Sequence, residues 1–157
     1  MSADTRFQEA ATALGYSFDG ELKVGGNYVP LMRDGTTLYV SGQVPRVGTT
    51  VVVTGRVGAD VVLVDAQVAA KVCAMRALAL LQRELGSLEN LRQVLRVTVY
   101  TQCTADFTHH SEVADGASEL LHAVLGEAGK HTRTSVGVYQ LPKNASVELD
   151  LIASAKG

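Results

Sequence analysis

The sequence predicts a mixed fold in which helices pack on a β-sheet, and three observations favour it. A 157-residue chain that is 46% hydrophobic can bury one sizeable core, which is typical of a single domain. Segments with period-two alternation and segments with helical spacing follow one another along the chain. Their order is two strands, a helix, a strand, a helix and two strands. This order favours an α/β-type sheet with both helices packed on it.

The N-terminal segment predicts a short helix followed by a loop. Apolar residues recur at helical spacing within residues 4–14, at Phe7, Ala11 and Leu14, and Gly15 is a suitable helix end. Residues 16–27 contain three glycines and a turn signal, which is typical of a loop.

Two β-rich runs flank Asp34 and Gly35, a pair that is a strong hairpin signal. Leu38 and Val40 share one face of the second run, as expected for a strand with one buried face. Residues 50–54 predict an added strand or an extended loop.

The stretch from Asp65 to Gly86 is the strongest helix candidate. Asp65 can cap its N-terminus, and Gly86 suits the left-handed conformation at its C-terminus. Lys71, Arg76 and Arg83 are predicted to face away from its apolar stripe. The stripe consists of Val68, Val72, Met75, Leu78, Leu81 and Leu85.

The remaining elements alternate again between strand and helix. Residues 94–101 predict a strand with Leu95, Val97 and Val99 on one face. Residues 109–129 predict a second helix, in which Gly116 costs about 1 kcal/mol relative to Ala. Two further strands lie on either side of the sequence LPKN near the C-terminus, and their spacing alone suggests a hairpin.

Composition disfavours several classes of function. The net charge is −2 without any basic run, so a nucleic-acid partner is not expected. The N-terminus lacks the pattern of a signal peptide, and no apolar run is long enough to span a bilayer, so we expect no membrane partner and a cytoplasmic protein. The two cysteines do not form a disulfide framework.

Common catalytic and ligand-binding motifs are missing from the sequence. The four histidines show no metal-ligand spacing, and no glycine run has the pattern of a phosphate loop, so we expect no metal site. Cys103 lies near His109 and could form a nucleophilic pair with it, but an ordinary buried thiol is the more common outcome.

Arg133 and Glu148 are the most informative charged residues. Arg133 is flanked by hydroxyl side chains that suit oxyanion recognition, and Glu148 has apolar neighbours on both sides in an otherwise apolar strand. A surface salt bridge or two solvated charges is the simpler alternative. Ser41 and Gln43 flank Gly42, where a ligand could approach the backbone closely.

Three segments together resemble the RidA family, also called the YjgF, reactive intermediate deaminase or endoribonuclease L-PSP family. They read NYVPLMRDGTTLYVSGQVP, LRVTVYTQCTADF and TRTSVGVYQLPKNASVELDLIA, and the match runs in order from Asn27 to Ala153. The resemblance implies an α+β, chorismate-mutase-like fold, with a mixed β-sheet and two helices packed on one face. It also implies a homotrimer with active sites in clefts between subunits, and it implies that the strand at Val94–Thr101 separates the last two strands.

The resemblance implies hydrolytic deamination of reactive enamines and imines. Substrates of the 2-aminoacrylate or 2-iminobutyrate type would yield 2-keto acids and ammonia, without a metal or an organic cofactor. A non-catalytic or regulatory protein that binds small keto or amino carboxylates in the same cleft is the alternative. The ribonuclease activity in the older family label is disfavoured by the acidic charge.

The resemblance also implies roles for individual residues. Arg133 matches the arginine that clamps the substrate carboxylate, which suits the paired donors of a guanidinium. Glu148 matches the carboxylate that positions the attacking water. The implied substrate-binding positions are Tyr28, Ser41, Gly42 and Ser135.

Departures from the family pattern indicate a divergent branch. Residues 1–22 form an N-terminal extension with a short helix before a core at 23–157, and there is an insertion near Val51. His131-Thr132 replaces the usual Pro-Ala before the arginine, and the usual asparagine after Asp106-Phe107 is absent.

Overall fold

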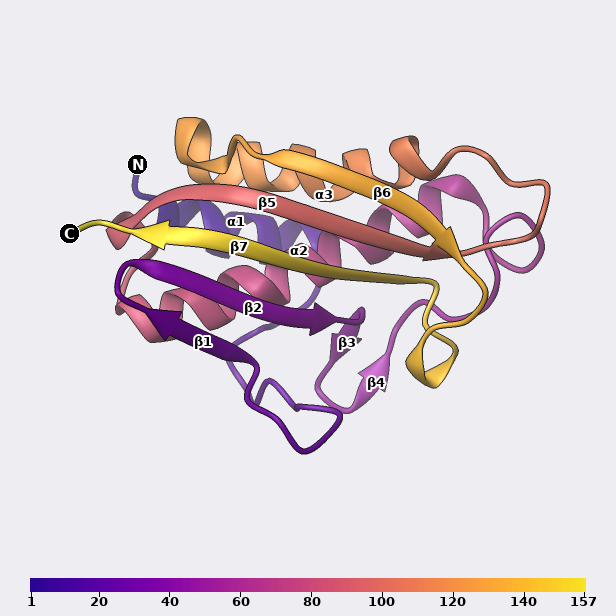
Figure 1. Cartoon of the computed structure of the whole chain (residues 1–157), viewed down its shortest axis with the longest axis horizontal. Helices are drawn as coiled ribbons and strands as arrows, with labels where there is room; N and C mark the ends of the chain where they lie inside the picture. The colour runs from indigo at the N-terminus through magenta and orange to yellow at the C-terminus, as the bar shows by residue number, and fades with distance from the viewer.

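The computed structural model describes all 157 residues and is built on one five-stranded mixed sheet, shown in Figure 1. β5 and β6 run parallel, whereas every other pair of neighbouring strands is antiparallel. Across the sheet the strands are β1 (Leu31–Asp34), β2 (Thr37–Gln43), β7 (Val147–Ala155), β5 (Leu91–Gln102) and β6 (Thr132–Val138).

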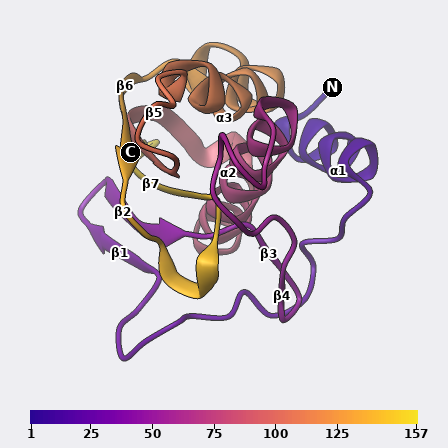
Figure 2. The ribbon, with the colours of Figure 1, turned by 90° about the vertical axis from the view of Figure 1, so that its right-hand side faces the viewer.

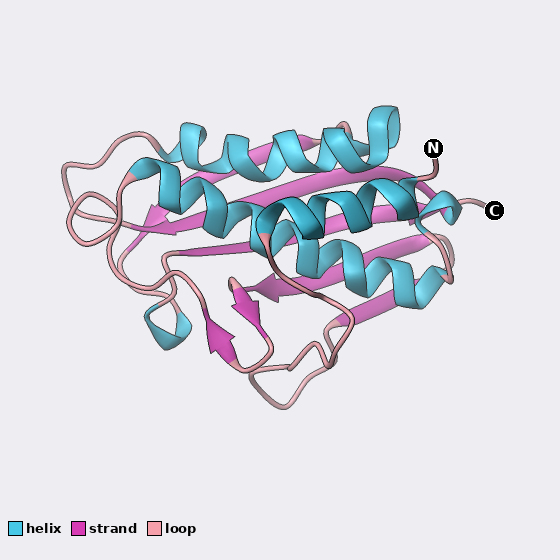
Figure 3. Ribbon diagram, turned by 180° about the vertical axis from the view of Figure 1, so that it is seen from behind, coloured by secondary structure: helices cyan, strands magenta, loops and turns pink.

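Helices cover only one face of this sheet. The long helices α2 (Leu63–Leu85) and α3 (His110–Leu125) pack side by side behind the strands, as Figure 3 shows. The helix α1 (Ala3–Leu14) packs on α2 and α3 and forms an outer layer, visible in Figure 2. The opposite face of the sheet, seen from the front in Figure 1, carries no helix.

The remaining elements are short. The strands β3 (Arg46–Val47) and β4 (Thr50–Val51) form a separate two-stranded sheet, so the added strand predicted near residue 50 is present. Three 3-10 segments connect the larger elements: η1 (Leu88–Asn90), η2 (Gly126–Gly129) and η3 (Pro142–Asn144). None of the helices combines the length and the apolar composition that crossing a membrane requires.

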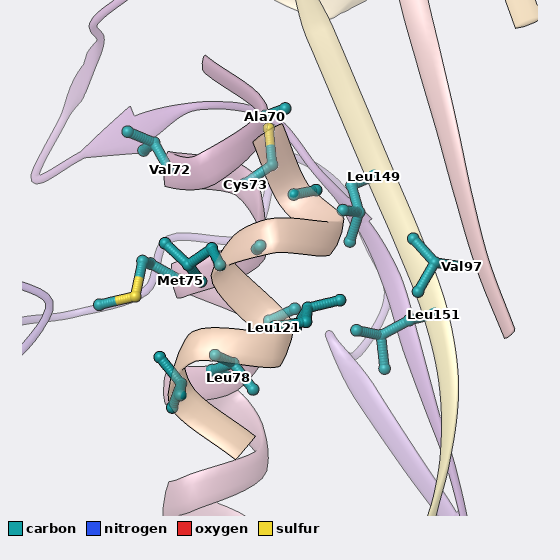
Figure 4. Close-up of a cluster of buried hydrophobic side chains, with 14 of the residues drawn as sticks. Ala70, Val72, Cys73, Met75, Leu78, Val97, Leu121, Leu149 and Leu151 are labelled. Carbon is teal, nitrogen blue, oxygen red and sulfur yellow. The ribbon is translucent and has the colours of Figure 1, made fainter. Parts of the chain in front are cut away.

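The core between the sheet and the two long helices is aliphatic. Leu121 of α3 points towards Leu151 of β7, as Figure 4 shows, and the Cys73 thiol of α2 lies 3.7 Å from the Val147 carbonyl oxygen of the same strand. Cys73, Leu121, Leu149 and Leu151 are all buried. Burial of this apolar surface is the main force that holds the layers together.

The topology confirms the prediction drawn from the family resemblance and corrects the simpler expectation from spacing. β7 pairs with β2 on one side and β5 on the other, and β6 pairs only with β5. The last two strands therefore do not form a hairpin. The hairpin predicted around Asp34 and Gly35 is confirmed, since β1 and β2 pair antiparallel across it.

Helix packing explains why a glycine stands at position 116 inside α3, although glycine is unfavourable in a helix. A β-carbon at this position would lie 2.5 Å from the carbonyl oxygen of Gln67 on α2. The Gln67 side chain in turn donates a hydrogen bond from Nε2 to the carbonyl of Glu112, at 2.9 Å. The absence of a side chain at Gly116 thus lets α2 and α3 approach closely.

Two local predictions are wrong. Helix α2 begins at Leu63 with Val62 at the capping position, so Asp65 lies inside the first turn and caps nothing. In β5 the register shifts between Val94 and Arg96, which turns Leu95 outwards and leaves it 39% exposed while Val94 is buried.

The N-terminal extension packs against the rest of the chain through both apolar and polar contacts. Phe7 and Phe18 are buried and meet edge to face, with ring centroids 6.4 Å apart. Asp4 accepts hydrogen bonds from Gln82 Nε2 at 2.7 Å and from the Leu88 amide at 2.9 Å. The apolar side chains of α1 belong to the same cluster as those of the sheet.

Candidate functional site

A β-bulge at the end of β2 shapes the first part of the candidate site. Val40 pairs with Leu151 and Gln43 with Leu149, so three steps along β2 match two steps along β7. The extra residue turns Gln43 towards the helices, where it is buried, and leaves Gly42 facing β7.

Gly42 lies directly against the Glu148 side chain. A β-carbon at Gly42 would be 2.6 Å from Glu148 Oε2, which is closer than non-bonded atoms approach. Because Val147 and Leu149 are buried on the helix side of β7, Glu148 points to the uncovered face of the sheet. The bulge and the glycine together make room for this carboxylate.

The Glu148 carboxylate is half-buried, and it accepts no hydrogen bond and forms no ion pair. Burial raises the pKa of Glu148 above its usual value, and the nearby Asp150 carboxylate raises it further. Asp150 itself accepts a hydrogen bond from the Tyr100 hydroxyl at 2.9 Å. A free carboxylate with a raised pKa holds a proton more readily than an ordinary glutamate does, which suits a group that takes up and releases a proton as a general base.

Four of the residues predicted from the sequence meet at one cavity of about 100 Å³. Tyr28, Ser41, Gly42 and Glu148 all line it, and we call this set the Glu148 half-site. These four lining residues come from the loop before β1, the end of β2 and the start of β7, three segments that can be followed in Figure 1.

The position of Arg76 in this region differs from the sequence prediction. Arg76 was expected to face away from the core, but it is 3% exposed and lines the cavity. Its Nε donates to Gln43 Oε1 at 3.1 Å, Nη1 to the Arg46 carbonyl at 2.9 Å and Nη2 to the Lys23 carbonyl at 3.0 Å. Arg76 thereby fixes three segments of the cavity wall. The sequence carried no direct signal for this, because the burial of Arg76 depends on contacts with segments far away in the chain.

Arg133 occupies a different part of the molecule. It lies on the edge strand β6 and faces α3, where Nη1 donates to Asp115 Oδ1 at 2.9 Å and to Ser118 Oγ at 3.0 Å. Nη2 donates to Ser111 Oγ at 2.8 Å and to the Ser111 carbonyl at 3.2 Å. We call Arg133 and Ser135, with these partners on α3, the Arg133 half-site.

The two departures from the family pattern near Arg133 both reach it. Ser111 lies in the segment after Asp106-Phe107 where an asparagine was expected, and it accepts from the guanidinium. His131 Nε2 lies 2.8 Å from Ser118 Oγ, and its Nδ1 donates to the Gly129 carbonyl at 2.6 Å. Burial lowers the pKa of His131, which favours the neutral ring. Ser118 therefore links His131 to Arg133.

The two half-sites do not meet within one chain. Arg133 pairs with Val97 of β5, and Glu148 pairs with Tyr100 of the same strand. With a strand spacing of about 4.8 Å and a rise of about 3.3 Å per residue, the two residues are separated by about 10 Å in each direction. Arg133 also points to the helix side and Glu148 to the uncovered side. One chain by itself therefore cannot bring both groups to one small molecule.

A second cluster joins Cys103 and His110, rather than the Cys103 and His109 considered from the sequence. His110 Nε2 lies 3.4 Å from Cys103 Sγ, and the His110 ring packs edge to face against Phe107. Burial raises the pKa of the Cys103 thiol, which works against thiolate chemistry. No three His, Cys, Asp or Glu side chains in the chain are grouped so that they could hold a metal ion.

Comparison with known proteins gives consistent results. The model of the family described as "YjgF/chorismate_mutase-like, putative endoribonuclease" matches residues 9–154. Protein TCP17 of Trypanosoma cruzi is 39% identical over 127 residues, which cover 80% of this chain and 79% of that protein.

Two solved structures share the fold over nearly the whole chain. Atu1372 from Agrobacterium tumefaciens, a protein with unknown function, is 37% identical with a TM-score of 0.89, covering 99% of this chain and 96% of that one. A "putative endoribonuclease" from Shewanella oneidensis MR-1 is 27% identical, also with a TM-score of 0.89, covering 98% and 99%. The chain belongs to the YjgF/chorismate mutase-like family, as its sequence motifs predicted.

Proposed function

We propose that this protein hydrolyses reactive imines and enamines of small amino acids to 2-keto acids and ammonia. The observation that carries the proposal is the Glu148 carboxylate, which is half-buried, has a raised pKa and has no partner in the chain. Such a group is costly to keep unless it acts on a ligand. Tyr28, Ser41 and Gly42 surround it in the same cavity.

The proposed site joins the Glu148 half-site of one copy to the Arg133 half-site of the next, in a homotrimer. The uncovered face of the sheet supports this assembly. Met32, Tyr39 and Ile152 form a row across β1, β2 and β7 on that face. Met32 is 60% exposed and Tyr39 47% exposed, and an apolar row of this kind is typical of a contact surface.

In the proposed reaction Arg133 binds the carboxylate of the substrate through charge-assisted hydrogen bonds. All four Nη hydrogens of Arg133 have acceptors, so the substrate takes the place of one of them. Asp115 is the acceptor that the substrate replaces. Its side chain is 50% exposed and can turn towards solvent, and the substrate carboxylate then takes its place beside the guanidinium.

Glu148 then acts on a water molecule at the imine carbon. The carboxylate accepts a proton from the water while the oxygen forms a bond to C2, which gives a carbinolamine after the imine nitrogen is protonated. Return of the proton from Glu148 to the amino group lets the C–N bond break, so that ammonia leaves. The hydroxyl proton passes to the Glu148 carboxylate as the C2 carbonyl of the keto acid forms, and its release to solvent balances the proton that the imine nitrogen took up. An enamine enters this path after protonation at C3, which converts it to the imine.

The charge of the chain as a whole disfavours a polynucleotide as the substrate. The chain carries a net charge of −2, whereas phosphate backbones are bound by basic surfaces. Both cysteines are free thiols, which suits the proposed cytoplasmic setting, where thiols stay reduced.

A trapping assay tests the proposal directly. A pyridoxal-phosphate threonine dehydratase generates 2-iminobutyrate from threonine, and semicarbazide captures the imine that has not yet hydrolysed. We expect the wild-type protein to lower the initial rate of semicarbazone formation, and Glu148→Gln or Arg133→Ala to remove the effect. Failure of the wild-type protein to lower the rate would contradict deamination.

The same variants separate catalysis from binding alone. One outcome would favour a binding or regulatory protein. In that outcome the wild-type protein binds 2-oxobutyrate saturably but does not hydrolyse the imine, and the Arg133→Ala variant does not bind 2-oxobutyrate.

A further inference from the structure

The cavity beside Glu148 is strongly cationic. Besides Glu148 its charged lining residues are Lys23, Arg46, Arg76 and Lys143, all of them positive. A second cavity of about 430 Å³ adjoins it, and Lys23, Arg46 and Lys143 line both. The cleft therefore continues beyond the proposed reacting position into a larger space that the same three cations line.

These cations have no anionic partners in the chain. The ion pairs of the protein join Arg33 to Glu84, His109 to Glu112, Lys130 to Glu127 and Arg133 to Asp115. Arg76 is the one member of the cluster whose hydrogen bonds are satisfied, by three acceptors of the cavity wall. It positions the wall, whereas the other three remain available to a ligand.

Arg46 provides the sharpest observation. Only 7% of the residue is exposed, yet its guanidinium makes no ion pair, and its Nε is buried without any acceptor. The backbone around it is well held, since its amide donates to the Val44 carbonyl at 2.8 Å and its carbonyl accepts from Arg76. A buried cation without a partner destabilises the folded chain, and a bound anion would offset this cost.

We infer that the substrate carries a second anionic group, and that Arg46, Lys23 and Lys143 bind this group in the adjoining cavity. The substrate would then be the imine or enamine of an acidic amino acid, or of one with a phosphorylated side chain. This inference rests on the proposed function for the position of the reacting end. The distal site for the second anion does not depend on the proposed function, because it is inferred only from Arg46 and the cations beside it.

Stable keto acids test the inference without any reaction. Isothermal titration of the wild-type protein should give a dissociation constant for 2-oxoglutarate at least about 10-fold lower than that for 2-oxobutyrate, as one added charge-assisted interaction provides. A parallel titration with 3-phosphohydroxypyruvate distinguishes a phosphate from a carboxylate as the preferred second anion.

Two variants assign the preference to the distal site. In Arg46→Gln the preference for 2-oxoglutarate should fall to within about 2-fold of equality, because the loss of affinity is larger for the keto acid with the second anion. Lys143→Gln, at an exposed position, should reduce the preference partly without any cost to folding. Arg92→Gln removes an exposed cation of β5 outside both cavities and should retain the full preference.

The outcomes separate this inference from the proposed function. Equal affinity for the two keto acids, no measurable binding of 2-oxoglutarate or of 3-phosphohydroxypyruvate, or a preference that survives Arg46→Gln would overturn the inference while leaving imine hydrolysis intact. A preference that depends on Arg46 in a protein without deaminase activity would keep the anion site and refute the proposed reaction.

Discussion

The Glu148 half-site and the Arg133 half-site hold their charges in opposite ways. The Glu148 carboxylate has no hydrogen-bond donor, and its pKa is raised by burial and by Asp150. The Arg133 guanidinium has acceptors for all its Nη hydrogens, including the carboxylate of Asp115. This difference suits the proposed reaction, in which the Glu148 carboxylate has to be free to change its charge, whereas a guanidinium that binds the substrate carboxylate gains from being oriented in advance.

The two half-sites also differ in how the chain builds them. Gly42 and the bulge of β2 make space for Glu148, so its position depends on the absence of atoms. Arg133 is held by side chains of α3, so its position depends on contacts. Substitutions should therefore separate the two half-sites.

Glu148→Gln should have the largest effect on catalysis. Glutamine keeps the volume of the side chain but cannot accept a proton, so kcat for 2-iminobutyrate should fall by about 100- to 1,000-fold, as for loss of a general base. KM should change little, which steady-state kinetics in the trapping assay will show. A variant that keeps more than half of the wild-type kcat would remove Glu148 from the chemistry.

The pH dependence of the wild-type protein follows from the same group. Because the pKa of Glu148 is raised, the active ionised form is lost as the pH falls through a value above that of an ordinary glutamate. Asp150→Asn removes the nearby negative charge and should move the acid limb of kcat/KM to lower pH. An acid limb that stays in place would show that another group controls it.

Arg133→Ala should act mainly through binding. Loss of the charge-assisted hydrogen bonds to the substrate carboxylate, worth about 1.5–3 kcal/mol each, should raise KM by about 10- to 100-fold. Arg92→Ala, an exposed arginine of β5, serves as the control and should leave KM unchanged. An unchanged KM in Arg133→Ala would mean that the guanidinium only supports α3.

Gly42→Ala tests the space behind Glu148. The new methyl group would lie 2.6 Å from the present position of Oε2, so the carboxylate has to move and kcat should fall by about 10-fold. The melting temperature should change little, because the displaced atoms are the end of a side chain. Gly20→Ala adds a methyl group in open space and is the matched control. Equal activity of the two variants would contradict the account.

Asp115→Asn should have the smallest effect, and in the favourable direction. The variant removes the carboxylate that competes with the substrate for Arg133, so KM should fall a few-fold, the range found for partly exposed ion pairs. Titration of 2-oxobutyrate provides a direct check. If the affinity falls instead, Asp115 orients the guanidinium more than it competes for it.

Much of the fold was predictable from the sequence, because apolar periodicity reports which face of each element is buried. The hairpin at Asp34-Gly35 and the inward faces of α2 and α3 follow from such patterns. The order of the last two strands did not, since short spacing suggests a hairpin and only the family resemblance placed β5 between them.

The candidate site was predictable only in part. Motifs pointed to Glu148 and to the residues around it, which meet at one cavity. The buried arginines 46 and 76 were missed because their burial depends on long-range packing of α2, β3 and the loop before β1. The outward turn of Leu95 was missed because a register shift leaves no mark in a period-two pattern.

The central claim is that the two half-sites work together only across two copies of the chain. Light scattering should first give a mass of about 50 kDa, three copies of the 16.6 kDa chain. The decisive measurement then mixes Arg133→Ala and Glu148→Gln in equal amounts, with unfolding and refolding to exchange subunits, and assays imine hydrolysis.

Each mixed trimer can join an intact Glu148 half-site to an intact Arg133 half-site. Random assembly makes about one cleft in four complete. At a substrate concentration well below the wild-type KM, where a raised KM also lowers the rate, the mixture should therefore recover about a quarter of the wild-type activity although each variant alone is nearly inactive. A mixture that remains as inactive as its two components would contradict a site shared between subunits.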